Sequence, residues 1–521
     1  MKRILTICLC AGLVAGMTSC NDFLDEEPKS SVSTDQFYRT PAQIQSAVNY
    51  LYRKGAPTYE SGTGAYYGTH SMLGGYLTGY FDSEYAGQEY IVAQSKSLTR
   101  SASLVSGQLD NIWDDSYQAI NAANACLKYG PEIKGVDAKL MAEAKFFRAY
   151  NYFYLVKMFG DVPFSLEPYE SAENMELSRT DSKTIYGQIV KDLKEAVADL
   201  PAGAFYENAN RITKNVANTL LAEVYMQMSG FPVKEDHYAD AAAAAKAVIA
   251  SGKHNLTAND DMGMNSAYNK LRTVDGLPEV IYGYEYNTTI SSGGYRPAWA
   301  FPNSFAAKFA ITISNNNYGL VNGIENMYDA SEDLRYQPNQ FFHWEFTFPG
   351  DDKPTKLGAT CNWYFFEEEA LFETGKAEKD VNIFRYPEVL LIAAEAIAQS
   401  SGVNAEAAGY LAQVKARASL KGKTADQYVS ELMSLSKDAF VREVWAERLR
   451  EFPLEYKVWD DIIRTRQFPT FSASNKGKIN YVNVIGAKNG NGATFKETDL
   501  LWPLSVNELQ RNPNLTQNPG Y

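Results

Sequence analysis

Long runs of helical periodicity constrain this sequence more than any other feature. In residues 137–163, DAKLMAEAKFFRAYNYFYLVKMFGDVP, apolar side chains recur at three- and four-residue steps, and Gly160 and Pro163 end the run. These apolar positions are Leu140, Ala144, Phe147, Tyr150, Tyr154 and Met158. The spacing is typical of a helix with a buried face. The sequence therefore predicts a mainly α-helical protein.

Further helical runs follow along the chain, and most have a neighbour across a short loop. They cover residues 181–201, 213–230, 238–252, 385–402, 404–420 and 437–452. Helices joined in this way pack as antiparallel hairpins. Small residues alternate with large ones in these runs, which allows the close stacking of tetratricopeptide-like hairpins. No regular repeat can be aligned, so the likeness to tetratricopeptide proteins concerns the architecture alone.

Two segments lack this periodicity: residues 253–377 are rich in Asn, Gly, Tyr and Trp, and residues 59–94 are rich in Gly and Tyr. They hold only short alternating runs, such as EVIYGYEY and HWEFTF, which indicate short strands among loops. Long irregular segments of this kind often carry function. We therefore predict a single domain over residues 35–521. Its helical scaffold is expected at about 35–58, 95–252 and 378–465, and its irregular ligand-binding lobe at about 59–94 and 253–377.

The N-terminus has the features of a lipoprotein signal. Two basic residues precede the apolar stretch 4–15, which is too short to span a bilayer. Removal of residues 1–19 would leave Cys20 at the new N-terminus for lipidation, although Met17 stands where Leu is usual. A secreted protein cut elsewhere, with a free Cys20, is the alternative. Residues 20–34 are polar and acidic and are expected to form a flexible tether.

Charge and cysteine content narrow the possible partners. The net charge is −13 and the chain has no basic run, which argues against nucleic acid and against an anionic membrane surface as partners. Beyond the signal and its cysteine, only Cys126 and Cys361 remain. A disulfide between them is possible, but two buried thiols are favoured. Neither belongs to a CxxC pair, so no metal or other cofactor is predicted.

Motifs of catalysis are lacking. The four histidines have no HExxH spacing, and the sequence contains no GxSxG motif and no glycine-rich phosphate loop. A glycosidase needs two carboxylates on either side of the scissile bond. Acids are abundant, for example at 351–352 and 367–369, but their spacing in the sequence pairs none of them. We expect a protein that is not an enzyme, and a surface glycosidase is the less favoured alternative.

The aromatic content is high, with 35 Tyr, 26 Phe and 7 Trp. Tyr and Trp combine an apolar face with a polar edge, which suits sugar rings. Aromatic residues in the helical runs are assigned to packing. Those in irregular polar segments are the candidate ligand-binding residues, and the three tryptophans among them are expected to project into water. With their polar neighbours, the candidates are Tyr80, Asp82, Tyr85, Tyr295, Arg296, Trp299, Trp344, Trp363 and Tyr364.

Four blocks in order along the chain resemble the SusD/RagB family, the surface glycan-binding lipoproteins that partner TonB-dependent outer-membrane transporters. The blocks are SCNDFLDEEP (19–28), AKFFRAYNYFYLVKMFGDVPF (144–164), FRYPEVLLIAAEA (384–396) and LWPLSVNELQRNPNLTQNPGY (501–521). The sequence departs from the family pattern at EYKVWDDIIR, where Tyr456 replaces Gly and Val458 replaces Arg. It also departs at YLAQVKARA, where Ala412 and Lys415 replace Asn and Arg. All matching blocks belong to the scaffold, so no ligand-binding residue is carried over.

The resemblance implies a helical scaffold with four tetratricopeptide-like units, no catalysis, and docking as a lid on a SusC-like barrel. The expected function is that of a lipid-anchored outer-membrane protein at the cell surface. It would bind an oligosaccharide or polysaccharide and deliver it to the transporter. Capture of a peptide or another nutrient by the same scaffold is the alternative.

Overall fold

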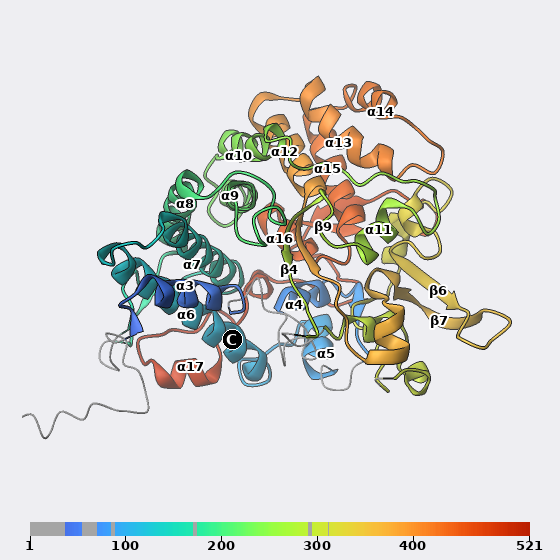
Figure 1. Ribbon diagram of the computed structural model, residues 1–521. Coiled ribbons are helices and arrows are strands. Elements are labelled where there is room, and N and C mark those ends of the chain that lie inside the picture. The colour runs from blue at the N-terminus through green and yellow to red at the C-terminus, as the bar shows by residue number, and fades with distance from the viewer. Residues whose placement is uncertain (1–36, 55–69, 85–88, 170–174, 290–293, 311) are drawn as a thin grey trace, which may run out of the picture.

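Helices make up about half of the structure. The computed structural model describes residues 37–54, 70–84, 89–169, 175–289, 294–310 and 312–521. Helices α3, α6 to α10 and α12 to α14 follow one another in an arc, beside a lobe of loops and short strands (Figure 1). The predicted mainly α-helical, tetratricopeptide-like fold is confirmed. The helices are α3 (Pro41–Leu51), α4 (His70–Leu77), α5 (Glu89–Ser97), α6 (Ser106–Tyr129), α7 (Ala138–Phe159), α8 (Ser182–Asp199), α9 (Lys214–Ser229), α10 (Tyr238–Ala250), α11 (Ala267–Thr273), α12 (Tyr386–Ser401), α13 (Ala405–Arg417), α14 (Ala425–Leu432), α15 (Lys437–Glu451), α16 (Val458–Thr465) and α17 (Val506–Arg511).

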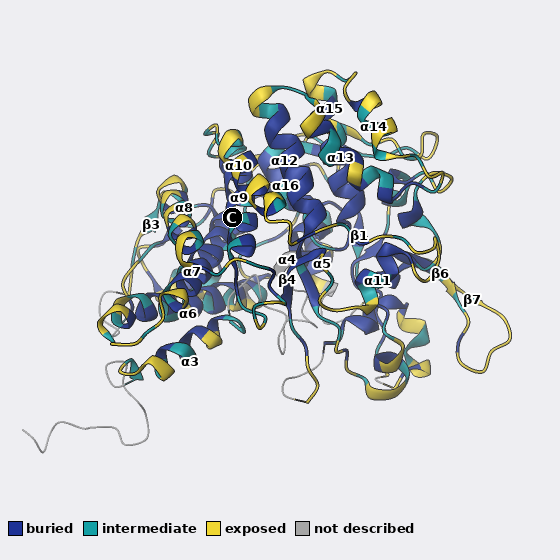
Figure 2. Ribbon diagram, turned by 45° about the horizontal axis from the view of Figure 1, so that its top comes forward, coloured by how far each residue is buried: buried dark blue, intermediate teal, exposed yellow. Residues whose placement is uncertain are grey.

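Helix α7 illustrates how local sequence sets the helix boundaries. The Asp137 carboxylate accepts a hydrogen bond from the Lys139 backbone N–H and caps the first turn. Gly160 ends the helix with a φ of +72°, which glycine adopts at little cost. The apolar spacing predicted a buried face, but the helix is buried on almost all sides because α3, α6 and α8 pack around it (Figure 2).

Consecutive helices pack against each other as the sequence predicts. Helix α7 contacts α6 and α8, and α10 lies between α9 and α12. The alanine-rich sequence of α10 and the small residues of α12 permit this close approach, since alanine adds little width to a helix. Helix α12 in turn contacts α13 and α15. The stack of hairpins thus forms one continuous apolar core.

The strands of the described segments form five two-stranded antiparallel ribbons. Phe81 lies opposite Leu320, Val280 opposite Arg385, and Phe342 opposite Asn362. The short strands predicted from EVIYGYEY and HWEFTF are present as β4 and β6. The pairs are β1 (Phe81–Asp82) with β5 (Gly319–Leu320), β2 (Val162–Pro163) with β3 (Arg179–Thr180), β4 (Val280–Tyr284) with β8 (Val381–Arg385), β6 (Phe342–Phe346) with β7 (Thr355–Asn362), and β9 (Gln467–Thr470) with β10 (Asn480–Asn483).

The structure differs from the expectation for residues 59–94. We expected loops and short strands, and the described part contains the short strand β1 but also α4 and the start of α5. Glycines weaken an isolated helix, which is why this segment looked irregular. Here they allow close packing of α4: a Cβ on Gly74 would lie 2.6 Å from the Cβ of Trp459 on α16, and one on Gly75 would overlap Tyr318.

Both cysteines of the described chain are buried and free. Cys126 lies in α6 and Cys361 in β7. The favoured interpretation of two buried thiols is therefore confirmed. The expected signal peptide, the lipidated Cys20 and the tether lie outside the described residues. Among the described helices, none combines the length and the apolar character needed to cross a bilayer.

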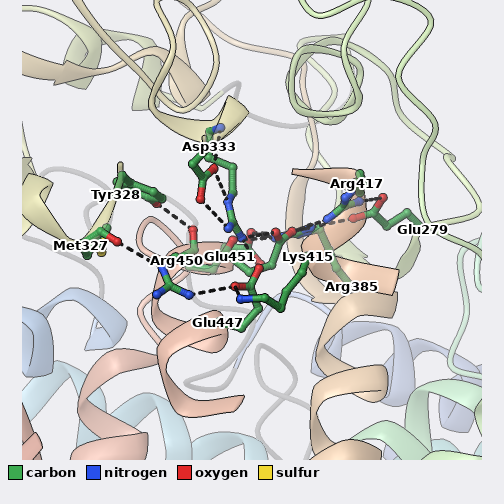
Figure 3. A network of polar contacts seen from close by, with 12 residues as sticks. Glu279, Met327, Tyr328, Asp333, Arg385, Lys415, Arg417, Glu447, Arg450 and Glu451 are labelled. Carbon is green, nitrogen blue, oxygen red and sulfur yellow. Dashed lines mark hydrogen bonds and ion pairs between the residues drawn. The ribbon is translucent and has the colours of Figure 1, made fainter. Parts of the chain in front are cut away.

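A buried ion network joins the lobe to the helices (Figure 3). Arg385, at the end of β8, contacts Glu279 at 2.6 Å and Glu451 of α15 at 2.8 Å. Arg335 contacts Glu447 at 2.7 Å and Glu451 at 3.1 Å. All five of these side chains are at most 2 % exposed.

Two further residues complete the network. Arg417 of α13 contacts Glu279 at 2.6 Å and also pairs with Glu451, and Asp333 contacts Arg335 at 2.7 Å. We use the name buried ion network for Glu279, Asp333, Arg335, Arg385, Arg417, Glu447 and Glu451. Each arginine meets at least two carboxylates, which is what a buried guanidinium requires.

Replacing Arg335 with Met is expected to lower the free energy of unfolding by about 3–5 kcal/mol, because the variant takes one cation from Glu447 and Glu451 and leaves Asp333 without an ion pair in the described chain. Chemical denaturation would measure the loss. The control is Lys421→Met, which removes an exposed ion pair with Glu332 and is expected to change stability little. Equal losses in the two variants would contradict a structural role for the network.

Candidate functional site

A cavity of 140 Å³, here called the junction cavity, lies between the helical scaffold and the lobe. One wall comes from α7, α9 and α16, and the other from β8, α11 and two 3-10 helices, η6 (Arg296–Ala300) and η10 (Trp363–Phe365). The lining contains both apolar and charged side chains. The residues used below are Tyr154, Lys157, Glu223, Arg272, Arg296, Tyr364, Asp380, Asn382, Glu455, Tyr456, Lys457 and Asp460.

Ion pairs form the helical wall of the cavity. Lys457 contacts Glu223 of α9 at 2.8 Å and Glu388 of α12 at 3.1 Å. Lys157 of α7 pairs with Asp460 of α16. These contacts tie four helices together at the cavity, because α7, α9, α12 and α16 each contribute a charged side chain.

The two carboxyl groups beside Lys457 titrate very differently. Burial raises the pKa of Glu388, and the nearby charge of Glu223 raises it further, so that it lies well above its usual range. Burial acts in the same direction on Glu223, but Lys457 and Lys157 outweigh it and lower its pKa to about 2. Of the two, only Glu223 lines the cavity.

The lobe wall consists of aromatic rings and arginines. The Arg296 guanidinium lies 5.3 Å from the Trp299 ring and 5.6 Å from the Tyr456 ring. The Tyr364 hydroxyl accepts a hydrogen bond of 2.9 Å from the Asn382 amide. Arg272 stands over the Trp363 ring at 4.9 Å, and burial lowers its pKa to about 10. Polar edges thus face the cavity from an apolar base, which suits a ligand with both characters.

Asp380 is the perturbed acid of the lobe wall. It accepts hydrogen bonds from the Tyr206 hydroxyl at 3.1 Å and the Tyr286 backbone N–H at 3.0 Å. Burial raises its pKa to about 6, and the charge of Asp275 contributes. This carboxyl therefore changes its charge near neutral pH.

Two family models match separate parts of the chain. The one described as "SusD family" matches residues 362–521, and the one described as "Starch-binding associating with outer membrane" matches residues 22–226. The chain is 25 % identical to SusD-like protein P2 of Formosa agariphila, over 98 % of both chains. The chain belongs to the SusD/RagB family.

Solved structures of SusD proteins share the fold. A SusD superfamily protein from Parabacteroides distasonis matches with a TM-score of 0.80 and 27 % identity, over 92 % of this chain and 99 % of that one. The surface glycan-binding protein A from Bacteroides thetaiotaomicron, solved in complex with laminarihexaose, matches with a TM-score of 0.66 and 17 % identity, over 92 % and 99 %.

The tryptophans expected to project from this SusD scaffold do not form an exposed platform, and that part of the prediction is wrong. Trp299 is 1 % exposed and packs edge-on against Phe365, and Trp363 is 3 % exposed and stacks on Phe366. Trp299 belongs to the main apolar core, which extends from the helices, and Trp363 fills a separate core within the lobe. Trp344 is half-buried and leans against Tyr336.

The remaining predicted residues are divided among different places. Arg296 and Tyr364 line the junction cavity. Tyr295, which precedes Arg296 in the sequence, is half-buried. Tyr80 is buried, and its hydroxyl donates to the Pro469 carbonyl, while Asp82 pairs with Lys96. Tyr85 lies outside the described residues. The structure therefore brings two of the nine candidates to one cavity.

Sequence reasoning missed the scaffold residues of the cavity, among them Tyr154, Lys457 and Tyr456. Tyr154 was assigned to helix packing, and Lys457 carries no motif. Tyr456 did give a signal, because it stands where the SusD family pattern has glycine. The φ of +64° at Tyr456 explains why the family pattern has glycine at this position, since the left-handed conformation is unfavourable for a residue with a Cβ.

Asp380→Asn is expected to flatten the dependence of stability on pH. The folded-state pKa of Asp380, about 6, lies above the unfolded value of 3.8, so the folded protein binds more protons between these values. Stability conferred by this group therefore falls as pH rises from 4 to 6, by about 2 kcal/mol after allowance for partial exposure. Urea unfolding at several pH values would measure the difference between wild type and variant. The exposed Asp352→Asn serves as control, and identical pH profiles for wild type and Asp380→Asn would contradict the perturbed pKa.

Proposed function

We propose that this protein binds oligosaccharide or polysaccharide at the cell surface, without catalysis, and delivers it to a SusC-like TonB-dependent transporter. The observation that carries the proposal is the junction cavity, lined by aromatic and charged side chains on a SusD scaffold. The laminarihexaose complex of a protein with the same fold supports a glycan as ligand. The family model that matches residues 22–226 is described as starch-binding and associating with the outer membrane. This description supports the outer membrane as the location of the protein.

The size and chemistry of the junction cavity support one sugar unit as its occupant. An apolar cavity of about 150 Å³ holds benzene, a six-membered ring without substituents, and the junction cavity measures 140 Å³. Tyr364, Asn382 and Arg296 supply groups that can hydrogen-bond hydroxyls, and Tyr456 supplies a ring. We assign the binding of one unit of the glycan to these residues, with Trp344 as a second, half-buried contact.

The charges of the cavity favour binding over hydrolysis. A glycosidase positions an acid and a second carboxylate on either side of one bond. Here Glu388 is fully enclosed behind Glu223, and Glu223 is held by Lys457. Glu388 is thereby kept away from a glycosidic oxygen, and Lys457 neutralises the charge of Glu223, which supports a protein that holds its ligand unchanged.

Tyr364→Phe is expected to weaken binding of a cavity ligand about 3- to 10-fold, because it removes a single hydroxyl from the wall. Calorimetric titration against a panel of neutral glycans, including laminarihexaose, would measure affinity. The matched control is Tyr410→Phe on α13, which removes a hydroxyl bonded to Glu406 at a distance from the cavity. Wild type that binds no glycan, or that releases reducing ends from one, would contradict the proposed function.

Cys20→Ala is expected to release the protein from the outer membrane, because the variant has no thiol for the lipid. Fractionation of cells and labelling with a radioactive fatty acid would measure attachment. Retention of label and of membrane association in the variant would contradict lipidation at Cys20.

A further inference from the structure

A second and larger cleft, of 660 Å³, lies above the buried ion network. Its walls come from α13, α14, α15 and the segment that leads into β10. It shares no lining residue with the junction cavity. We call it the basic cleft, after the three cations at its rim, Arg442, Lys476 and Lys478. Tyr428 and Tyr481 also belong to its lining.

The floor of the basic cleft carries charges that neutralise one another. Arg335 and Arg450 both contact Glu447, at 2.7 Å and 3.0 Å. Lys415 pairs with Glu443. Because each of these cations already has a carboxylate, the floor offers a ligand little net charge.

The rim of the basic cleft differs from its floor in how its cations are paired. Arg442, Lys476 and Lys478 are exposed, and within the described chain none of them forms an ion pair. The acids near them are already engaged: Glu332 pairs with Lys421, and Asp329 accepts hydrogen bonds from Ser331. Arg442 and Lys478 therefore have no ion-pair partner in the described chain, and the charge of Lys476 acts only through space on Asp329, whose pKa it helps to lower.

The two lysines are held in place by the backbone between them. The Gly477 carbonyl accepts a hydrogen bond of 2.8 Å from Arg450, and its N–H donates to the Asn326 carbonyl at 2.9 Å. Its φ is +80°, and a Cβ there would lie 3.1 Å from the Cβ of Asp329. Glycine is therefore required, and the turn presents Lys476 and Lys478 from a fixed position.

We propose that the basic cleft binds a sugar unit that carries a carboxylate or a sulfate. The volume lies within the range of small-ligand sites, about 300–1,000 Å³. Arg442 and the two lysines can pair with the anionic group, while the polar floor can hydrogen-bond the hydroxyls. This inference rests on the proposed function, because it makes an acidic glycan a ligand of this protein.

The concave shape favours a glycan over an acidic segment of a partner protein, since protein interfaces of lasting affinity bury wide surfaces. The cleft also sits on the ion network, so its floor is rigid before a ligand enters. An acidic glycan would then contact the protein at two places, with neutral units free to occupy the junction cavity.

The test uses the full soluble domain and three probes: a tetragalacturonate for the carboxylate, a sulfated carrageenan oligosaccharide for the sulfate, and laminarihexaose as the neutral glycan. The variant replaces Arg442, Lys476 and Lys478 with Ala. The control replaces three exposed lysines outside the cleft, Lys134, Lys191 and Lys353, with Ala, and thus changes the net charge equally. Circular dichroism checks that both variants are folded.

We expect at least one anionic probe to bind wild type and the control, and to bind the cleft variant about tenfold more weakly or not at all. High salt should weaken this binding in wild type, and laminarihexaose should be unaffected by the variant. Unchanged affinity of the anionic probe in the variant, or an equal loss in the control, would overturn the proposal. Binding of laminarihexaose alone would overturn it while leaving the proposed function standing, and binding of no glycan would overturn both.

Discussion

The buried ion network is the constraint on which the arrangement of this molecule depends. Its arginines come from the lobe, from the end of β8 and from α13, and its carboxylates from the lobe and α15. Charges removed from water are tolerated only where every partner is in place, so the network fixes the lobe against the helices. Both cavities depend on it. Glu455, bonded to Arg385, lines the junction cavity, and Arg335 lines the basic cleft.

The need of buried polar groups for matched partners also explains why the fold could be predicted from four short blocks of sequence. Arg148 forms a bidentate pair with Asp192, at 2.7 Å and 2.8 Å, and Arg464 forms one with Glu395. Asn518, near the C-terminus, donates to the Phe159 and Trp502 carbonyls. A buried polar group tolerates few substitutes, because an unmatched partner costs its full desolvation. Such residues leave a recognisable pattern in the sequence.

The site was harder to predict, because residue type alone does not separate a ring that fills a core from one that meets a ligand. Trp299 and Trp363 occur in polar, irregular sequence and still lie inside the lobe, where an Arg side chain covers each ring. Their burial depends on contacts between segments far apart in the chain, which composition does not report. For the same reason Gly74 suggested a loop, whereas it is the point at which α4 meets Trp459.

Tyr456 shows where such a scaffold can change the wall of its cavity without changing its fold. Its left-handed backbone costs about 1–2 kcal/mol relative to glycine. The ring offsets this cost through an edge contact with Tyr318, at a centroid distance of 5.0 Å, and through the Arg296 guanidinium above it. Because the strained residue lies in the wall of the junction cavity and outside the ion network, replacing it alters the shape of the cavity while the charged contacts that hold the lobe stay in place.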